Sequence, residues 1–157
     1  MTTRPLTVST EVDASKSAVW ETFTTPEGIR SFFAPACNVD ITPLGAYEIF
    51  FDPDAPPGQR GAEGNVVLAV QPETMLSFTW NFPNEFESLR DQRTAVAVRI
   101  ADAGPERTTV TVTQTGWGTG DEWDEAREYF REAWGKVVLA KLRRRFAEES
   151  TLQREET

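Results

Sequence analysis

The chain contains few side chains that could act as a nucleophile, a general base or a metal ligand. It has no histidine and only one cysteine, Cys37. Catalysis by a serine or cysteine that depends on histidine is therefore excluded, as are the usual zinc sites. A single cysteine forms no internal disulfide and no cysteine-based metal cluster, which agrees with a reducing compartment. Because its neighbours are apolar, we interpret Cys37 as a small buried side chain, and we expect neither a metal nor a cofactor.

Carboxylates and one tyrosine remain as candidates for acid-base chemistry. Glu48, Glu63 and Tyr47 have suitable side chains, but they form no recognisable catalytic pair. Glu48 alternates with Tyr47 and Ile49, so we expect its carboxylate to face away from the interior. These patterns favour a protein without catalysis and leave an enzyme as an open alternative.

Two charged clusters and a glycine-rich segment have structural explanations. Acids gather between Asp121 and Glu128, and arginines occupy Arg143–Arg145. These signs suit the beginning and the end of one helix, whose dipole they complement. The segment Gly116–Gly120 lacks the spacing of a phosphate-binding loop. We expect it to turn the chain into the helix, with Trp117 closing one end of a cavity.

Composition narrows the range of partners and compartments. The chain of 157 residues has 25 acidic and 16 basic side chains, a net charge of -9. This charge repels phosphate backbones and anionic lipids, so we expect neither nucleic acid nor membrane as a partner. No stretch of about 20 apolar residues and no apolar N-terminal run is present. We expect a cytoplasmic protein.

Apolar residues recur with a period of two over most of the chain, which predicts strands. The clearest case is 75–82, where four apolar side chains alternate with three polar ones. The Pro- and Gly-rich segment 52–61 is expected to be a loop. Strands are predicted over 6–12, 39–41, 47–52, 64–71, 75–82, 94–100 and 108–114, the last two as a hairpin.

Helical patterns occupy two regions. Ser15 and Thr25 are suitable caps for two short helices, and Pro26 suits the first turn of the second one, which ends before Pro35. A long helix is predicted from Asp121 to about residue 149, followed by a frayed tail over 150–157. The chain then forms one domain, 1–157, with its core in 6–148. Its fold class is α+β: a curved antiparallel sheet of about seven strands wraps around the long C-terminal helix.

Several stretches resemble the SRPBCC superfamily, which has the START-like or birch-pollen-allergen helix-grip fold. They resemble in particular the branch named after the activator of the heat-shock-protein-90 ATPase. The resemblance covers roughly 6–148, although this chain has Ala133-Trp134 where members often have Gly-Trp. The matching stretches are 13–20, 25–28, 43–47, 64–72, 76–80 and the helix around Trp134.

This resemblance implies a cavity between sheet and helix, which in many relatives holds a small apolar or aromatic molecule. It implies no single reaction, because the superfamily includes lipid carriers, hormone receptors, aromatase/cyclases and co-chaperone domains. The alternative for the interior is that its side chains simply fill the core. Residues expected to bind a ligand are Phe33, Tyr47, Ile49, Phe51, Phe78, Trp80, Phe82, Val98, Trp117, Phe130 and Trp134.

Four details of this fold are open to test. Tyr47 and Trp80 carry polar groups that either orient a ligand or bond to backbone or water. The loop 81–93 forms either a mobile lid or an ordinary connection. Val137 and Val138 are expected to face inward with Trp134. A second apolar stripe of the helix, which starts at Gly135, is expected to pack against the two short helices.

We therefore expect a START-like domain that binds a small apolar or aromatic molecule without catalysis. The second interpretation is a co-chaperone-like module that interacts with other proteins through its surface. The third is an enzyme of the cyclase or hydrolase type. A chaperone and a second copy of the chain remain candidate partners.

Overall fold

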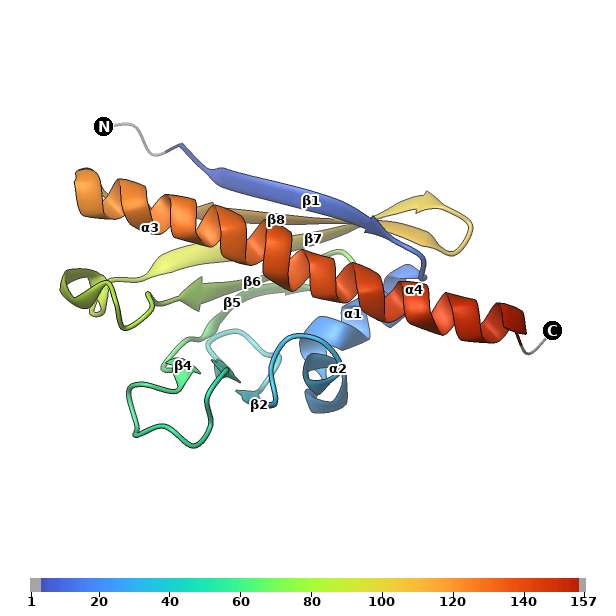
Figure 1. Ribbon diagram of the computed structural model, residues 1–157, viewed down its shortest axis with the longest axis horizontal. Helices are drawn as coiled ribbons and strands as arrows, with labels where there is room; N and C mark the ends of the chain where they lie inside the picture. The colour runs from blue at the N-terminus through green and yellow to red at the C-terminus, as the bar shows by residue number, and fades with distance from the viewer. Residues whose placement is uncertain (1–3, 156–157) are drawn as a thin grey trace.

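An antiparallel sheet of five strands forms one layer of the molecule, and a long C-terminal helix crosses its face (Figure 1). The computed structural model describes the backbone of residues 4–155 and the side chains of residues 4–147. The α+β helix-grip architecture is therefore confirmed. In spatial order the strands are β1 (Leu6–Val12), β8 (Arg107–Thr115), β7 (Thr94–Gly104), β6 (Met75–Trp80) and β5 (Val67–Gln71).

The alternation of apolar and polar side chains determines which face of the sheet is buried. In β6, Leu76, Phe78 and Trp80 are buried, while the intervening Ser77 and Thr79 are only partly covered. β7 and β8 form the predicted hairpin, in which Val98 lies opposite Val112. The buried face of all these strands lies toward the helix, because one face of an antiparallel sheet needs an apolar cover.

A smaller sheet extends this layer. It contains β2 (Ala36–Val39), β3 (Tyr47–Phe50) and β4 (Gly61–Ala62). A bridge between Ala46 and Val66 connects it to the larger sheet. The sequence predicted about seven strands in one sheet, whereas residues 4–155 form eight strands in two hydrogen-bonded groups. β4 pairs with β3 and β5 pairs with β6, and the division falls beside Gly64, whose φ of 75° interrupts the extended chain between β4 and β5.

Two short helices follow β1, as predicted. α1 (Lys16–Thr24) begins after Ser15, whose hydroxyl accepts a hydrogen bond from the Ala18 amide at 3.2 Å. α2 (Pro26–Arg30) begins after Thr25, whose hydroxyl accepts one from the Gly28 amide at 3.0 Å. The corner between them is tight, because a Cβ atom on Gly28 would lie 2.1 Å from the Glu21 carbonyl oxygen. Both predicted caps are confirmed.

The C-terminal helix is continuous but changes its winding. α3 (Asp121–Glu132) leads into a π-helical segment, η2 (Ala133–Val138), and then into α4 (Leu139–Glu155). Within η2 the Leu139 amide donates to the carbonyl of Trp134, five residues earlier. The helix ends later than predicted, so Arg143–Arg145 lie in its interior and not at its end. Of the predicted frayed tail, 156–157 lie outside the described residues, as do the side chains of 148–157.

The second buried stripe of the helix faces the edge strand of the sheet. A Cβ atom on Gly135 would lie 3.6 Å from Cγ1 of Val8 in β1. α4 also packs against β1, where Leu139 and Leu142 are buried. The prediction that Gly135 meets the two short helices was therefore wrong, because the curled sheet brings β1 against this side of the helix.

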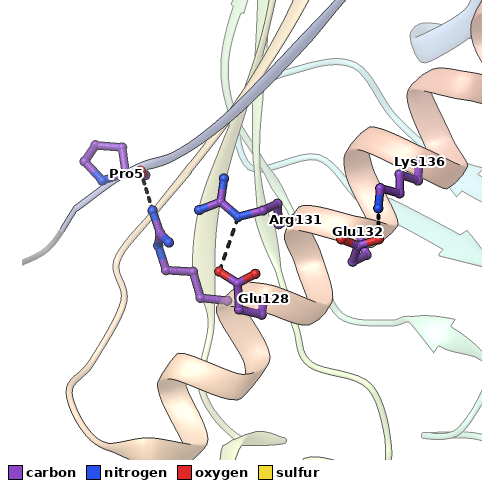
Figure 2. A network of polar contacts seen from close by, with 6 residues as sticks. Pro5, Glu128, Arg131, Glu132 and Lys136 are labelled. Carbon is purple, nitrogen blue, oxygen red and sulfur yellow. Dashed lines mark hydrogen bonds and ion pairs between the residues drawn. The ribbon is translucent and has the colours of Figure 1, made fainter.

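Charged side chains on α3 and η2 form a polar outer surface (Figure 2). Arg131 pairs with Glu128 at 3.3 Å, and Lys136 pairs with Glu132 at 3.0 Å. The latter two residues are four positions apart, with the acid first, which is the favourable orientation in a helix. Arg127 donates to the carbonyl oxygen of Pro5 at 3.0 Å and so connects the helix to the start of β1.

Two further predictions concern the burial of Cys37 and the absence of a membrane-spanning segment. Cys37 in β2 was expected to be buried, but it is only partly buried. This partial burial raises the pKa of its thiol. The nearby Arg30 guanidinium opposes this rise. Among the helices of residues 4–155, none has both the length and the apolar character that crossing a membrane requires.

Candidate functional site

A pocket of about 210 Å³ opens between the end of β6 and the π-helical segment. Three parts of the chain form its walls: the loop between β3 and β4, the segment that leaves β6, and the face of α3 and η2. Its lining comprises Phe51, Asp52, Gln59, Arg60, Gly61, Ala62, Trp80, Asn81, Phe82, Pro83, Asn84, Arg90, Tyr129, Phe130, Ala133, Trp134 and Val138.

Aromatic rings form the inner wall of this pocket. The rings of Trp80 and Trp134 have their centroids 5.2 Å apart, and those of Phe82 and Phe130 lie 5.6 Å apart. These four side chains are buried, yet they leave a space beside them. The wall is therefore apolar and suited to stacking against a planar ligand.

The structure divides the predicted site residues into two groups. Those that line the pocket are Phe51, Trp80, Phe82, Phe130 and Trp134. Those that lie outside its lining are Phe33, Tyr47, Ile49, Phe78, Val98 and Trp117, all of them buried. Packed side chains therefore surround the second group, and a pocket opens beside the first.

Tyr47 belongs to the packed end. Its ring stacks on Phe78 with centroids 4.2 Å apart, and its hydroxyl donates to the carbonyl oxygen of Phe23 at 2.8 Å. Burial raises the pKa of this hydroxyl far above its ordinary value, so it stays protonated at neutral pH. Its hydrogen bond is therefore made within the protein.

Phe33 and Trp117 support the pocket from behind. Phe33 stacks on Trp80 with centroids 6.1 Å apart. Trp117 lies 6.3 Å from Phe82 and 6.0 Å from Phe130, again between centroids. Its indole donates to the carbonyl oxygen of Gln114 at 2.9 Å. Both rings hold pocket-lining rings in place without lining the pocket.

The π-helical segment determines which valine reaches the pocket. Val138 is buried and lines it, whereas Val137 is 47% exposed. The prediction that Val137 faces inward was wrong, because it assumed regular α-helical periodicity after Trp134. A π turn contains about one residue more than an α turn. The residue that lies one turn after Trp134 on the same face is therefore Val138 and not Val137.

A buried glutamine fixes the position of Trp134. The carbonyl oxygen of the Gln114 side chain accepts from the Trp134 indole at 2.9 Å, and its amide group donates to the Thr94 hydroxyl at 2.8 Å. Thr94 in turn donates to the Trp80 carbonyl oxygen at 3.2 Å. Gln114 was not among the predicted site residues, although its alternation with Val110 and Val112 places it on the inner face.

The mouth of the pocket is polar. Asp52, Arg60 and Arg90 line it, from two loops that are distant in the sequence. The Arg60 Nε donates to the carbonyl oxygen of Ala55 at 3.0 Å. Arg90 donates to the carbonyl oxygen of Phe82 and to that of Gly58. Sequence reasoning missed these residues, because no local pattern shows that the two loops meet.

Buried asparagines hold the pocket wall between β4 and β6. Asn81 lines the pocket and donates to the Gly61 carbonyl oxygen at 3.0 Å. Its own carbonyl accepts from Asn65 at 3.0 Å, and Thr79 donates to Asn65 at 3.1 Å. These bonds replace the backbone pairing that is missing beside Gly64.

The loop 81–93 contributes part of this wall. It contains a 3-10 turn, η1 (Glu87–Leu89), and buries both Phe86 and Leu89. The ring of Phe86 meets that of Tyr129 with centroids 5.8 Å apart. The loop therefore packs on α3 through apolar side chains, next to the pocket mouth.

The carboxylates considered for acid-base chemistry lie outside the pocket lining. Glu48 accepts hydrogen bonds at 2.8 Å from the Asn38 side chain and from the Gly64 amide. One carboxylate oxygen of Glu63 is buried without a hydrogen-bond partner among the described residues. No group of three histidine, cysteine, aspartate or glutamate side chains in the described part of the chain could hold a metal ion.

Comparisons with known proteins agree with this architecture. The family model described as "Activator of Hsp90 ATPase homolog 1-like protein" matches residues 13–147. No curated protein sequence matches the chain at a significant level.

Solved structures share the fold at low sequence identity. Protein MLL2253 from Mesorhizobium loti has a TM-score of 0.72 and 20% identity, over 92% of this chain and 98% of that one. CalU16 from Micromonospora echinospora has a TM-score of 0.68 and 17% identity, over 98% of this chain and 83% of its own. PFC0360w, an HSP90 activator from Plasmodium falciparum, has a TM-score of 0.65 and 13% identity, over 87% and 91% respectively. At these identities the likeness shows the fold alone.

Proposed function

The chain belongs to the family of Activator of Hsp90 ATPase homolog 1-like proteins, and on this premise we propose that it binds a small apolar or aromatic molecule. The binding site is the pocket between β6 and η2. The observation that carries this proposal is an open space of about 210 Å³ beside four buried aromatic rings. Protein interiors are normally close-packed, so such a space next to large side chains is typical of a ligand site.

The size of the pocket limits the ligand. A dry apolar cavity of about 150 Å³ accommodates benzene. A space of about 210 Å³ therefore suits a single ring with a short substituent. The ring would lie between Trp80 and Phe130, in contact with the aromatic inner wall.

The test is a titration with hydrocinnamyl alcohol, a neutral molecule of this size, followed by amide NMR spectra. We expect saturable shifts at Trp80, Phe130 and Trp134. The variant Ala133→Leu fills the pocket from the helix and should abolish these shifts. The matched control is Arg143→Leu, which adds the same side chain at an exposed position outside the pocket lining.

Two results would contradict the proposal. One is the absence of saturable shifts in the wild-type protein at millimolar probe. The other is binding that survives in Ala133→Leu, since a ligand that still binds must occupy another site. A folded Ala133→Leu protein, checked by circular dichroism, is required for the comparison.

A co-chaperone-like function is the second candidate. It is favoured by the description of the matching family and by the fold shared with an HSP90 activator. The test is the ATPase rate of a purified heat-shock-protein-90 with and without this protein. Stimulation that also occurs with Ala133→Leu would support a surface interaction independent of the pocket. An unchanged rate together with no detectable association would contradict this candidate.

A further inference from the structure

The mouth of the pocket carries an excess of positive charge. Arg60 and Arg90 line it together with one acid, Asp52. This excess is unusual for the chain, which has a net charge of -9. The aromatic inner wall and the basic mouth therefore divide the pocket into an apolar part and a cationic part.

Both arginines are held in place by the protein itself. Arg60 is partly buried and donates from Nε to Ala55 at 3.0 Å. Arg90 is also partly buried and donates to the carbonyl oxygens of Phe82 and Gly58. A guanidinium has five N–H groups, so each arginine keeps donors beyond these bonds. A cation fixed in this way binds an anion with less loss of side-chain freedom.

The positive charge of the two arginines is not neutralised by a neighbouring side chain. Neither Arg60 nor Arg90 forms an ion pair with a carboxylate in the described part of the chain. Asp52 is exposed, so water screens its repulsion of an anion. Tyr129 also lines the pocket, and burial raises the pKa of its hydroxyl, which adds no negative charge at neutral pH.

We propose that the pocket selects small carboxylic acids, whose single ring lies among the aromatic side chains and whose carboxylate is bound by Arg60 and Arg90. This inference rests on the proposed ligand-binding function and specifies the class of ligand. Arginine is suited to this role because its planar fork binds a carboxylate through two parallel hydrogen bonds. Charge-assisted bonds of this kind are about twice as strong as neutral ones.

The test compares three probes of the same shape: hydrocinnamate, hydrocinnamyl alcohol and phenylpropylamine. Affinities are measured by amide NMR titration at neutral pH and low salt. We expect the acid to bind about tenfold more tightly than the alcohol, and the amine more weakly than both. Added sodium chloride should weaken binding of the acid and leave binding of the alcohol unchanged.

Charge variants show which residues cause the preference for the acid. Arg60→Gln should lower the affinity for hydrocinnamate to about that for the alcohol, while the affinity for the alcohol stays the same. Asp52→Asn should raise the affinity for hydrocinnamate, because it removes the one acid at the mouth. The control Arg99→Gln, at an exposed position of β7 outside the pocket lining, should change neither. Arg90→Gln is less suitable, because Arg90 holds two loop carbonyls.

The outcomes separate this inference from the proposed function. If the acid and the alcohol bind equally, the selection of acids is overturned while the apolar site stands. If Arg60→Gln leaves the preference intact, the binding of the carboxylate by Arg60 is overturned. If neither probe binds, the proposed function fails and the inference fails with it. The inference is supported if the preference for the acid falls in Arg60→Gln and rises in Asp52→Asn.

Discussion

Replacing Gln114 by methionine should destabilise the protein by removing the link between sheet and helix. Gln114 is fully buried and bonds to the Trp134 indole at 2.9 Å and to the Thr94 hydroxyl at 2.8 Å. Methionine has a similar volume, so the change creates little cavity. What it does create is an indole N–H without a partner, in a place that water does not reach.

The magnitude follows from the two lost bonds. A buried donor left without a partner costs about 1–3 kcal/mol, and a lost internal hydrogen bond costs about 1 kcal/mol. Thr94 still donates to the Trp80 carbonyl, so its hydroxyl is not left isolated. We expect the free energy of unfolding to fall by about 2–4 kcal/mol, which lowers the melting temperature by about 5–15 °C in a chain of this size.

The assay is urea unfolding of four proteins: wild type, Gln114→Met, Trp134→Phe and the double variant. Phenylalanine has no N–H group that could lose its hydrogen-bond partner. Gln114→Met should therefore lower the free energy of unfolding by about 1–2 kcal/mol less in the Trp134→Phe background. Gln71→Met makes the same substitution at an exposed strand position and should change stability by less than about 0.5 kcal/mol. A loss below about 0.5 kcal/mol for Gln114→Met, or additive effects in the cycle, would refute the reasoning.

Three further predictions test other parts of the fold. Gly28→Ala should destabilise by about 1–3 kcal/mol, because the new Cβ would meet the Glu21 carbonyl at 2.1 Å; an unchanged urea midpoint would contradict the tight corner. Gly135→Ala should be neutral or stabilising by up to about 1 kcal/mol, since its Cβ makes an ordinary contact with Val8 at 3.6 Å, whereas Gly135→Leu should destabilise. Burial raises the pKa of Tyr47, so above about pH 10 the unfolded chain loses this proton while the folded one keeps it. Stability should therefore fall with rising pH in that range, and Tyr47→Phe should flatten the fall in urea titrations; an equally steep fall in that variant would show that other groups cause it.

The elements that local chemistry determines were predictable from the sequence. Ser15 and Thr25 cap helices because their hydroxyls reach amides three residues on, which depends on nothing distant. The alternation in 75–82 placed Phe78 and Trp80 on the buried face. These patterns, together with their order along the chain, also predicted the family, which the match over 13–147 confirms.

The basic mouth of the pocket could not be predicted in the same way. Arg60 and Arg90 lie in loops separated by three strands, and each is positioned by carbonyl groups that no periodic pattern reveals. Both line the pocket because the two loops meet there, where Arg90 donates to the Gly58 carbonyl oxygen. A single sequence contains no local signal for such a meeting.

Trp134 and Gly135 show why the helix departs from regular winding. Trp134 must face the sheet, where Gln114 holds its indole, while Gly135 lies against Val8 of the edge strand. Two neighbouring residues thus contact two different parts of a curved sheet. Gly135 leaves room for an ordinary contact between a Cβ atom and Val8, and the π turn shifts the following residues so that Val138 lines the pocket. The π-helical segment η2 therefore contributes both to the packing of the core and to the lining of the pocket. This agrees with the frequent occurrence of π turns at functional sites.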